Sequence, residues 1–279
     1  MDITTATAAD RDEGLFGTDS VTWRIHGDPV MILGGLRALL LQALHPRAMA
    51  GVAQHSGFRG DPWGRLVRTA DYIGAVTYGT TAQAQQAGAR LREIHARIRA
   101  TDPATGRSFR VDRPELLLWV HCAEVDSMLS VYRRCGGRLT DAEADGYVAE
   151  QTTAAALVGL DPAKVPADAA DLAAFFEGVR PELHVTPEAR RAARFVLGPP
   201  MPRWVSIATP ARPAWAGMAT LAFAMLPRWA RRMYALPGLP TTDLAASITG
   251  RALRSGLLAL PPAVREGPHR KAARARVGA

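Results

Sequence analysis

Apolar residues recur at helical spacing along almost the whole chain, and no segment shows sustained apolar–polar alternation between hairpin turns. An α-helix repeats every 3.6 residues and a strand every two, so the period of the apolar pattern decides which element can bury it. Glycines and prolines, 25 and 20 of the 279 residues, divide the pattern into segments of helical length. The chain is therefore predicted to be all-α, a single large bundle of roughly ten helices that encloses a pocket.

The expected helices cover most of the chain. Pro114 suits a first helical turn, Gly136-Gly137 suits a helix end, and Thr140 to Glu143 has capping-box spacing. The central bundle should consist of the segments 30–45, 65–78, 82–100 and 115–134. Further helices are expected over 46–55, 147–157, 167–179, 187–196, 213–226, 227–236 and 244–260.

The domain organisation is predicted to be an N-terminal extension (1–22), one helical domain (23–262) and a basic, disordered tail (263–279). The 34 Lys and Arg residues outnumber the 26 acidic residues and give a net charge of +8; the tail holds five of these cations against one acid. A helix-turn-helix protein would carry its basic residues on one recognition helix. Here the arginines flank apolar helices instead, so no specific nucleic-acid partner is expected.

The compartment is predicted to be the cytoplasm. The first residues have neither a basic region nor an apolar core, so no secretory leader is expected. Cys122 and Cys135 lie 13 residues apart in one predicted helix, about 20 Å at 1.5 Å per residue, too far for a disulfide. The longest apolar stretches, 30–44 and 213–226, are too short to span a bilayer. Peripheral contact of the basic, aromatic segment 227–234 with a membrane stays open.

Several common sites are excluded because their motifs are absent. The sequence holds no P-loop, no dinucleotide-binding Gly-x-Gly-x-x-Gly, no His-Glu-x-x-His and no Gly-x-Ser-x-Gly. A ferritin-like di-iron centre needs Glu-x-x-His on two helices, and the sequence holds this spacing only once, at Glu266 and His269, so such a centre is excluded. Cys-x-x-Cys-His is missing too, so any haem would be bound without a covalent link.

The segment around His95 is the most informative. His95 should face inward, because it lies beside the apolar stripe of its helix, formed by Ala87, Leu91, Ile94 and Ile98. Arg92 precedes it by three residues and Arg99 follows it by four. An imidazole can ligate haem iron while flanking guanidiniums pair with the propionates. By spacing alone, however, an inward histidine between arginines is more often a hydrogen-bonded core or edge residue.

A set of short motifs over residues 20–240 resembles a known family. The motifs are Trp23-Arg24, Asp28-Pro29, LLQALHP (40–46), GVAQHS (51–56), DPWGRLVRT (61–69), Ile94-His95, WVH (119–121) and VDS (125–127). They are similar to the MpaB / rubber-oxygenase (latex-clearing protein) family, the former DUF2236 domain. The resemblance implies an all-helical fold that binds haem b and uses dioxygen to cleave isoprenoid carbon–carbon double bonds. It assigns the proximal, iron-ligating histidine to His95, with Arg92 and Arg99 as cofactor-binding residues.

The same resemblance assigns the distal, catalytic side of the haem to Arg65, Arg68 and Thr69, which match the family's Arg-x-x-Lys-Thr. Arg68 departs from that pattern. A lysine amine can deprotonate and ligate iron, whereas a guanidinium stays protonated and can only donate hydrogen bonds. We therefore expect an open distal face on which Arg68 and Thr69 donate hydrogen bonds and Arg65 orients the pair. The alternative for both arginines is a solvated helix edge.

Other residues compete for these roles. His121 lies in the apolar segment 117–121 and is the alternative axial ligand. Glu124 and Asp126 lie nearby, but two acids without a matched pair of histidines do not make a metal site, so we expect them to form solvated or helix-capping pairs.

The leading hypothesis is a haem b-dependent oxygenase that acts with dioxygen on a small, apolar organic molecule. The alternative is a non-enzymatic helical protein that binds haem or lipid as a sensor or carrier.

Overall fold

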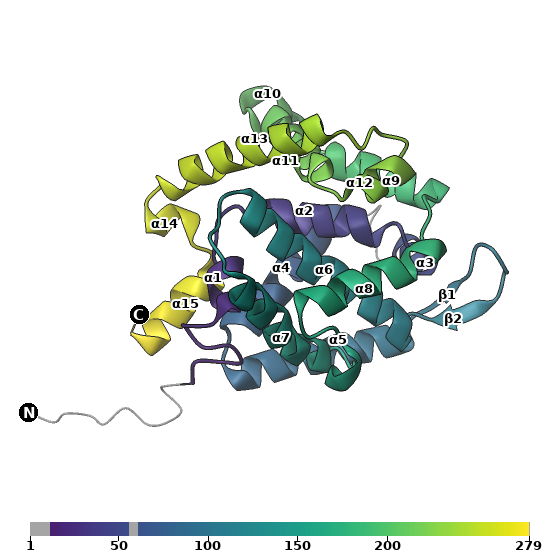
Figure 1. Ribbon diagram of the computed structural model, residues 1–279, viewed down its shortest axis with the longest axis horizontal. Helices are drawn as coiled ribbons and strands as arrows, with labels where there is room; N and C mark the ends of the chain where they lie inside the picture. The colour runs from purple at the N-terminus through teal and green to yellow at the C-terminus, as the bar shows by residue number, and fades with distance from the viewer. Residues whose placement is uncertain (1–11, 56–60, 279) are drawn as a thin grey trace, which may run out of the picture.

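The computed structural model describes residues 12–55 and 61–278, which form helices apart from one short hairpin (Figure 1). The all-α prediction is confirmed. The first elements are α1 (Val21–His26), α2 (Met31–Gln42), α3 (Pro46–His55), α4 (Pro62–Tyr78), α5 (Thr81–Arg97), β1 (Arg99–Thr101), β2 (Ser108–Arg110), α6 (Pro114–Arg134) and α7 (Asp141–Leu157). After η2 (Pro162–Lys164), α8 (Ala169–Val179) and η3 (Arg180–Glu182) come α9 (Pro187–Leu197), α10 (Arg203–Ala208), α11 (Ala211–Ala224), α12 (Arg228–Met233), α13 (Pro240–Leu258), α14 (Pro262–Arg265) and α15 (Pro268–Val277).

The centre of the core is the contact between α2 and α6. Leu33, Leu36, Leu40 and Leu41 of α2 are at most 2% exposed, as expected of a predominantly apolar helix in the centre of the fold. Trp119 of α6 is fully buried and donates from its indole Nε1 to the Gln42 carbonyl at 3.0 Å. This hydrogen bond ties the end of α2 to the first half of α6.

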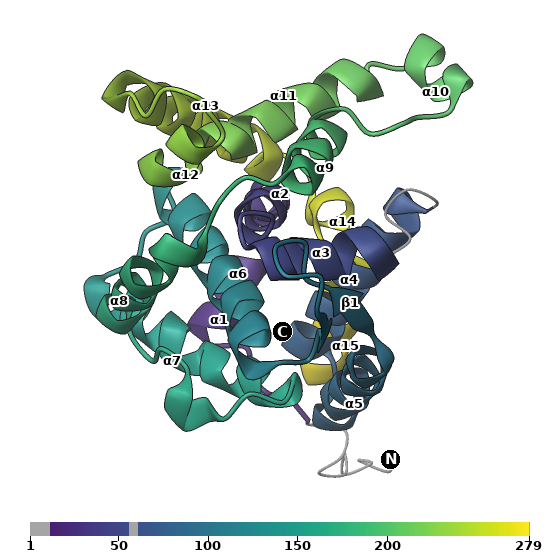
Figure 2. The same ribbon diagram turned by 90° about the vertical axis from the view of Figure 1, so that its right-hand side faces the viewer.

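The helical hairpin α4–α5 stands opposite α6 and α7, with α2 and α3 above the space between the two pairs (Figure 2). Its turn is set by a capping box, in which Thr80 and Gln83 each bond the other's backbone. The turn is further held by Asp12, whose carboxylate accepts hydrogen bonds from the backbone and hydroxyl of Thr81, both at 2.9 Å. The last residues before α1 therefore belong to the folded body, and residues 1–11 of the predicted N-terminal extension lie outside the described residues.

The predicted helix 82–100 is shorter than expected. It ends at Arg97, and β1 then pairs with β2 in an antiparallel hairpin with Ala100 opposite Phe109. These two residues are buried and their neighbours are exposed, so the strands alternate as strands should. Three residues per strand are too few to reveal that period in the sequence.

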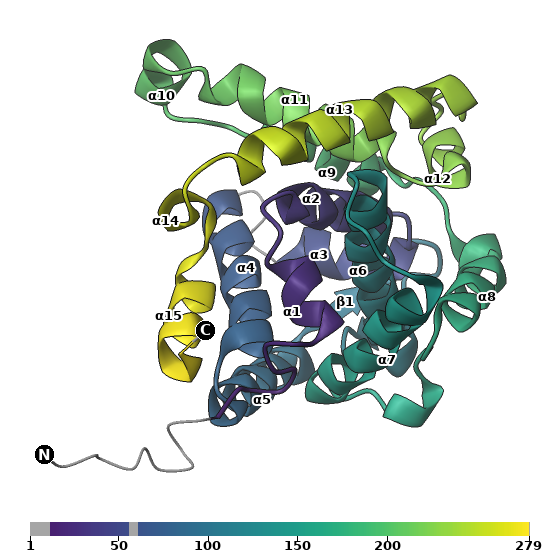
Figure 3. The ribbon, with the colours of Figure 1, turned by 60° about the vertical axis from the view of Figure 1, so that its left-hand side comes forward.

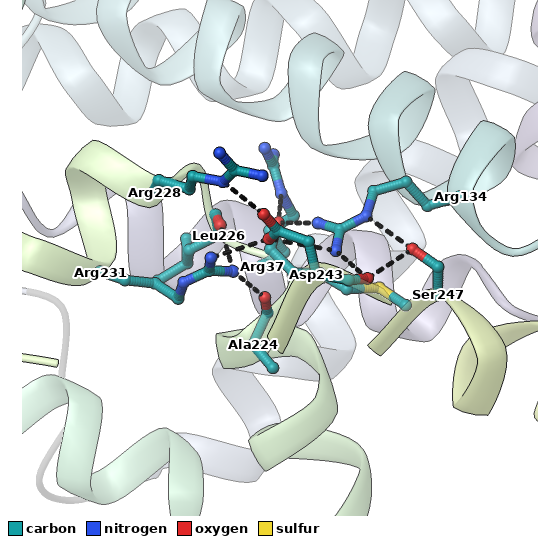
Figure 4. Close-up of polar contacts among 9 residues, drawn as sticks. Arg37, Arg134, Ala224, Leu226, Arg228, Arg231, Asp243 and Ser247 are labelled. Carbon is teal, nitrogen blue, oxygen red and sulfur yellow. Dashed lines mark hydrogen bonds and ion pairs between the residues drawn. The ribbon is translucent and has the colours of Figure 1, made fainter. Parts of the chain in front are cut away.

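An upper layer of α9 to α13 covers α2 (Figure 3). Its polar anchor is Asp243 at the start of α13, which receives Arg231 at 2.7 Å and Arg228 at 2.5 Å (Figure 4). Arg134 of α6 joins them by donating to the Asp243 carbonyl at 3.2 Å. The carbonyl of Met225 accepts from Arg37 and Arg134 at 2.9 Å each. Asp243 thus connects α12 and α13 to the central helices.

The prediction of a disordered tail is wrong for residues 263–278, because α14 and α15 are helical and α15 packs on α4 (Figures 1 and 3). Ala273 is fully buried against Trp23 and Tyr78. The tail's cations bond the main chain of the bundle: Arg276 donates to the Tyr78 carbonyl at 2.9 Å, and Arg270 donates to the Gly27 carbonyl at 2.5 Å. These two arginines therefore hold α15 against the helical bundle. No helix in the described part of the chain is long and apolar enough to cross a membrane.

Candidate functional site

A cavity of about 1490 Å³ lies in the space that α4 and α5 share with α6 and α7. It exceeds the volume of about 300–1,000 Å³ that is typical of small-molecule pockets. Most of its wall is apolar, and this part of the wall includes Leu36, Leu39, Leu117, Val120, Phe195 and Trp215. The cavity therefore has room for a large, flat, apolar ligand together with a second molecule.

His95 lies on the cavity wall near the end of α5, so its inward orientation agrees with the spacing argument. Its Nδ1 atom is buried and has no hydrogen-bond partner among the described residues. Burial lowers the pKa of His95, and the nearby Asp112 opposes this shift. A neutral imidazole keeps a nitrogen lone pair, which is the form that ligates a metal.

His121 reaches the same cavity from α6. Burial lowers its pKa to about 4, so this imidazole is also neutral near pH 7. By position and protonation, both histidines can serve as a ligand. In the described part of the chain no cluster of three or more His, Cys, Asp or Glu residues could hold a metal ion.

The three proposed distal residues share the cavity-facing side of the first half of α4. Arg65 is partly buried, and burial lowers its pKa, with the charge of Arg68 adding to the shift. Arg68 is more exposed, with 64% of its side chain accessible, and donates to the Asp61 carboxylate at 3.0 Å. The hydroxyl of Thr69 donates to the Arg65 carbonyl at 3.0 Å, so its one proton is already engaged.

The arginines predicted to flank His95 are not on the cavity wall as the structure describes it. Arg92 donates to the carbonyl of Leu157, at the end of α7, at 2.5 Å. Arg99 lies beyond the end of α5 and is exposed in β1, opposite Arg110. The expectation that Arg99 lies one helical turn after His95 is wrong, because the helix has ended. Arg90, which spacing did not single out, does line the cavity.

Two further polar residues on the wall were not assigned to the site by the sequence argument: Tyr72 was not considered, and Glu124 was expected to form a solvated or capping pair. Glu124 faces the cavity from α6, and burial raises its pKa to about 7. Tyr72 faces it from α4 and has a buried hydroxyl with no partner among the described residues. The expectation of a solvated or capping pair is wrong for Glu124, whereas Asp126 pairs with the buried Arg37 at 2.8 Å. The signal for Glu124 was its position three residues after His121, on the same helix face.

Comparison with known families decides the classification. Residues 23–259 match the family model described as the ER-bound oxygenase mpaB/B'/rubber oxygenase catalytic domain. The chain belongs to this family. No curated protein and no solved structure matches the chain.

Membership in the mpaB/rubber oxygenase family indicates an oxygenase-type enzyme that acts on a small substrate. The match includes His95, His121 and the cavity-facing part of α4. It ends near the last residue of α13, so α15 lies outside the family's catalytic domain. Ser56, the last residue of one motif behind the resemblance, lies outside the described residues.

Proposed function

We propose that the protein is a haem b-dependent oxygenase that uses dioxygen on an apolar small molecule, with His95 as the residue that would ligate the iron. The observation that carries the proposal is His95 itself: a neutral imidazole with an unpartnered, buried nitrogen, on the wall of a large apolar cavity. An unsatisfied buried polar atom costs about 1–3 kcal/mol, and a bound group can relieve that cost.

The residues of the cavity fit haem in kind and number. The apolar wall suits a porphyrin face, and Arg65 and Arg90 offer cations to the propionates. Because α4 and α5 run antiparallel from the turn at Gly79 and Thr80, Arg65 lies at the level of His95 along the hairpin. In this proposal Arg65 and Arg90 replace Arg92 and Arg99 as cofactor-binding residues. When bound, haem b supplies an iron centre that reacts with dioxygen.

The chain's own residues contribute positioning and hydrogen bonds. Arg68 stays protonated and donates from the cavity mouth, where Asp61 holds its guanidinium. Thr69 offers an oxygen lone pair, because its proton bonds the helix. The apolar wall around them excludes water and holds an apolar substrate.

The test is the absorption spectrum of protein purified with an adequate supply of haem. We expect a Soret band corresponding to nearly one equivalent of haem b, which His95→Ala loses and His121→Ala keeps. Circular dichroism of both variants serves as the folding control. The reverse result would move the axial ligand to α6. A folded, colourless protein after haem titration would refute the proposal.

Turnover separates the oxygenase from a haem-binding sensor or carrier. Haem-loaded protein is incubated under ¹⁸O₂ with panels of terpenoid and aromatic compounds. Label in two product carbonyls indicates double-bond cleavage, and label in one hydroxyl indicates monooxygenation. Haem binding with neither oxygen uptake nor product would support the carrier.

A further inference from the structure

Glu124 is the one carboxylate that α6 directs into the cavity, and the proposed function does not use it. No described residue donates a hydrogen bond to Glu124, and burial raises the pKa of its carboxyl group to about 7. A buried carboxyl group without a partner is costly, so structures usually pair it. Here the unpaired group faces ligand space.

Tyr72 of α4 offers a second polar group on the cavity wall. Its buried hydroxyl has no partner among the described residues. Burial raises the pKa of Tyr72 to about 12; the charge of Glu124 adds to the shift and that of Arg92 opposes it. Tyr72 and Glu124 thus face the same cavity from α4 and α6, and no hydrogen bond joins them.

The polar side chains around this corner are already engaged. His26 bonds the hydroxyls of Thr77 and Tyr147 at 3.0 Å each, and Gln151 donates to Thr22 at 2.8 Å. Their hydrogen bonds hold α1 to α4 and α7, so these groups serve the fold. Within the described residues, no such hydrogen bond is seen for the side chains of Glu124, Tyr72 and His121. His121 lies one turn before Glu124 on the same face of α6.

We infer that Tyr72, His121 and Glu124 form a polar corner that binds the hydroxyl group of an otherwise apolar alcohol. A hydroxyl both donates and accepts, so one alcohol group can donate to the Glu124 carboxylate and accept from the Tyr72 phenol. An ammonium group only donates, so it would leave the phenol proton of Tyr72 without an acceptor. This inference rests on the proposed function, because it names the class of substrate that the oxygenase would take.

The test compares three probes that share one octyl chain and differ at the polar end: 1-octanol, its methyl ether and octylamine. Calorimetry on the full-length protein should show that 1-octanol binds about tenfold more tightly than the ether, the effect of one net hydrogen bond. Glu124→Leu and Tyr72→Phe should each reduce this preference to less than about threefold. Glu93→Leu, a matched change at an exposed cavity-lining glutamate, should preserve it.

Equal binding of alcohol and ether by the unchanged protein would overturn the inference. So would a preference that survives Glu124→Leu, or tighter binding of octylamine than of octanol. Haem content is recorded for each preparation, and we expect both variants to keep it. A protein that takes up no haem contradicts the proposed function alone, because the alcohol preference is measured on the same sample without turnover.

Discussion

Arg68 marks the mouth of the cavity, where solvent and Asp61 share its guanidinium. A hydrogen-bond donor in a closed active site is worth about 10²- to 10³-fold in kcat. Solvent weakens an exposed charge, so we expect a smaller effect here. Arg68→Ala should leave haem content unchanged and slow oxygen-dependent turnover by about tenfold. The rate of oxygen uptake per haem measures this change in turnover.

The control for this change is Arg97→Ala, which removes an exposed arginine at the end of α5. Uptake that is unchanged in Arg68→Ala would remove Arg68 from the mechanism. Loss of haem in that variant would place Arg68 among the residues that hold the cofactor instead.

Single residues show where sequence spacing succeeds and where it fails. The helical period places His95 beside Leu91 and Ile98, and His95 does face the cavity. The same period could not place Arg99, because it does not show that the helix stops at Arg97. Nor could it assign Glu124, since an apolar helix face can meet either a solid core or a cavity, and only the three-dimensional arrangement distinguishes the two.

At the scale of elements, α13 depends on Asp243. Arg231 is nearly fully buried and faces this carboxylate, so removing the negative charge leaves a buried cation without its partner. Breaking such a pair typically costs 3–5 kcal/mol; because Asp243 is partly exposed, we expect Asp243→Asn to lower the free energy of unfolding by about 2–3 kcal/mol. Urea denaturation measures the loss, and Asp141→Asn, at an exposed pair with Arg133, is the control.

The pH dependence of this effect follows from the pKa of Asp243. Burial opposes ionisation of the carboxyl group, but hydrogen bonds from Arg228 and Arg231 outweigh it and lower the pKa below 3.8. The stabilisation is therefore present above pH 3.8 and is lost as the pH falls through the lower folded value. The difference between the two proteins should be constant near neutrality and shrink in acid. A difference that grows in acid would contradict this assignment.

Long elements were predictable and short ones were not. Each segment of the expected central bundle contains a long helix, because ten or more residues display the 3.6-residue period. The helices that were not expected are α1, α10, α14 and α15. Three of them have only four to six residues. In α15 the one buried residue is Ala273, which lies among arginines in the sequence, so the packing of this helix could not be inferred from its charge pattern.

The whole molecule is built around its cavity. One wall, α4 and α5, is supported from outside by α15, while the other, α6 and α7, is fixed to α1 and α2 (Figures 2 and 3). The polar hydrogen bonds of His26 join the two walls at one end. A ligand that contacts both walls would therefore add contacts between α4–α5 and α6–α7, which the protein itself joins at one end.

Haem should thus stabilise the entire fold by binding the native state alone. At a hundredfold excess over Kd this linkage adds about 2.7 kcal/mol. At about 2 °C per kcal/mol for a chain of this size, we expect the Tm to rise by roughly 5 °C. Metal-free protoporphyrin, which can fill the cavity but offers no iron to His95, should raise the Tm less. His95→Ala should respond equally to both porphyrins, because only the iron bond distinguishes them. Differential scanning calorimetry gives the change in Tm for the unchanged protein and for His95→Ala, each with haem and with metal-free protoporphyrin. If haem raises the Tm of both proteins equally, His95 does not ligate the iron.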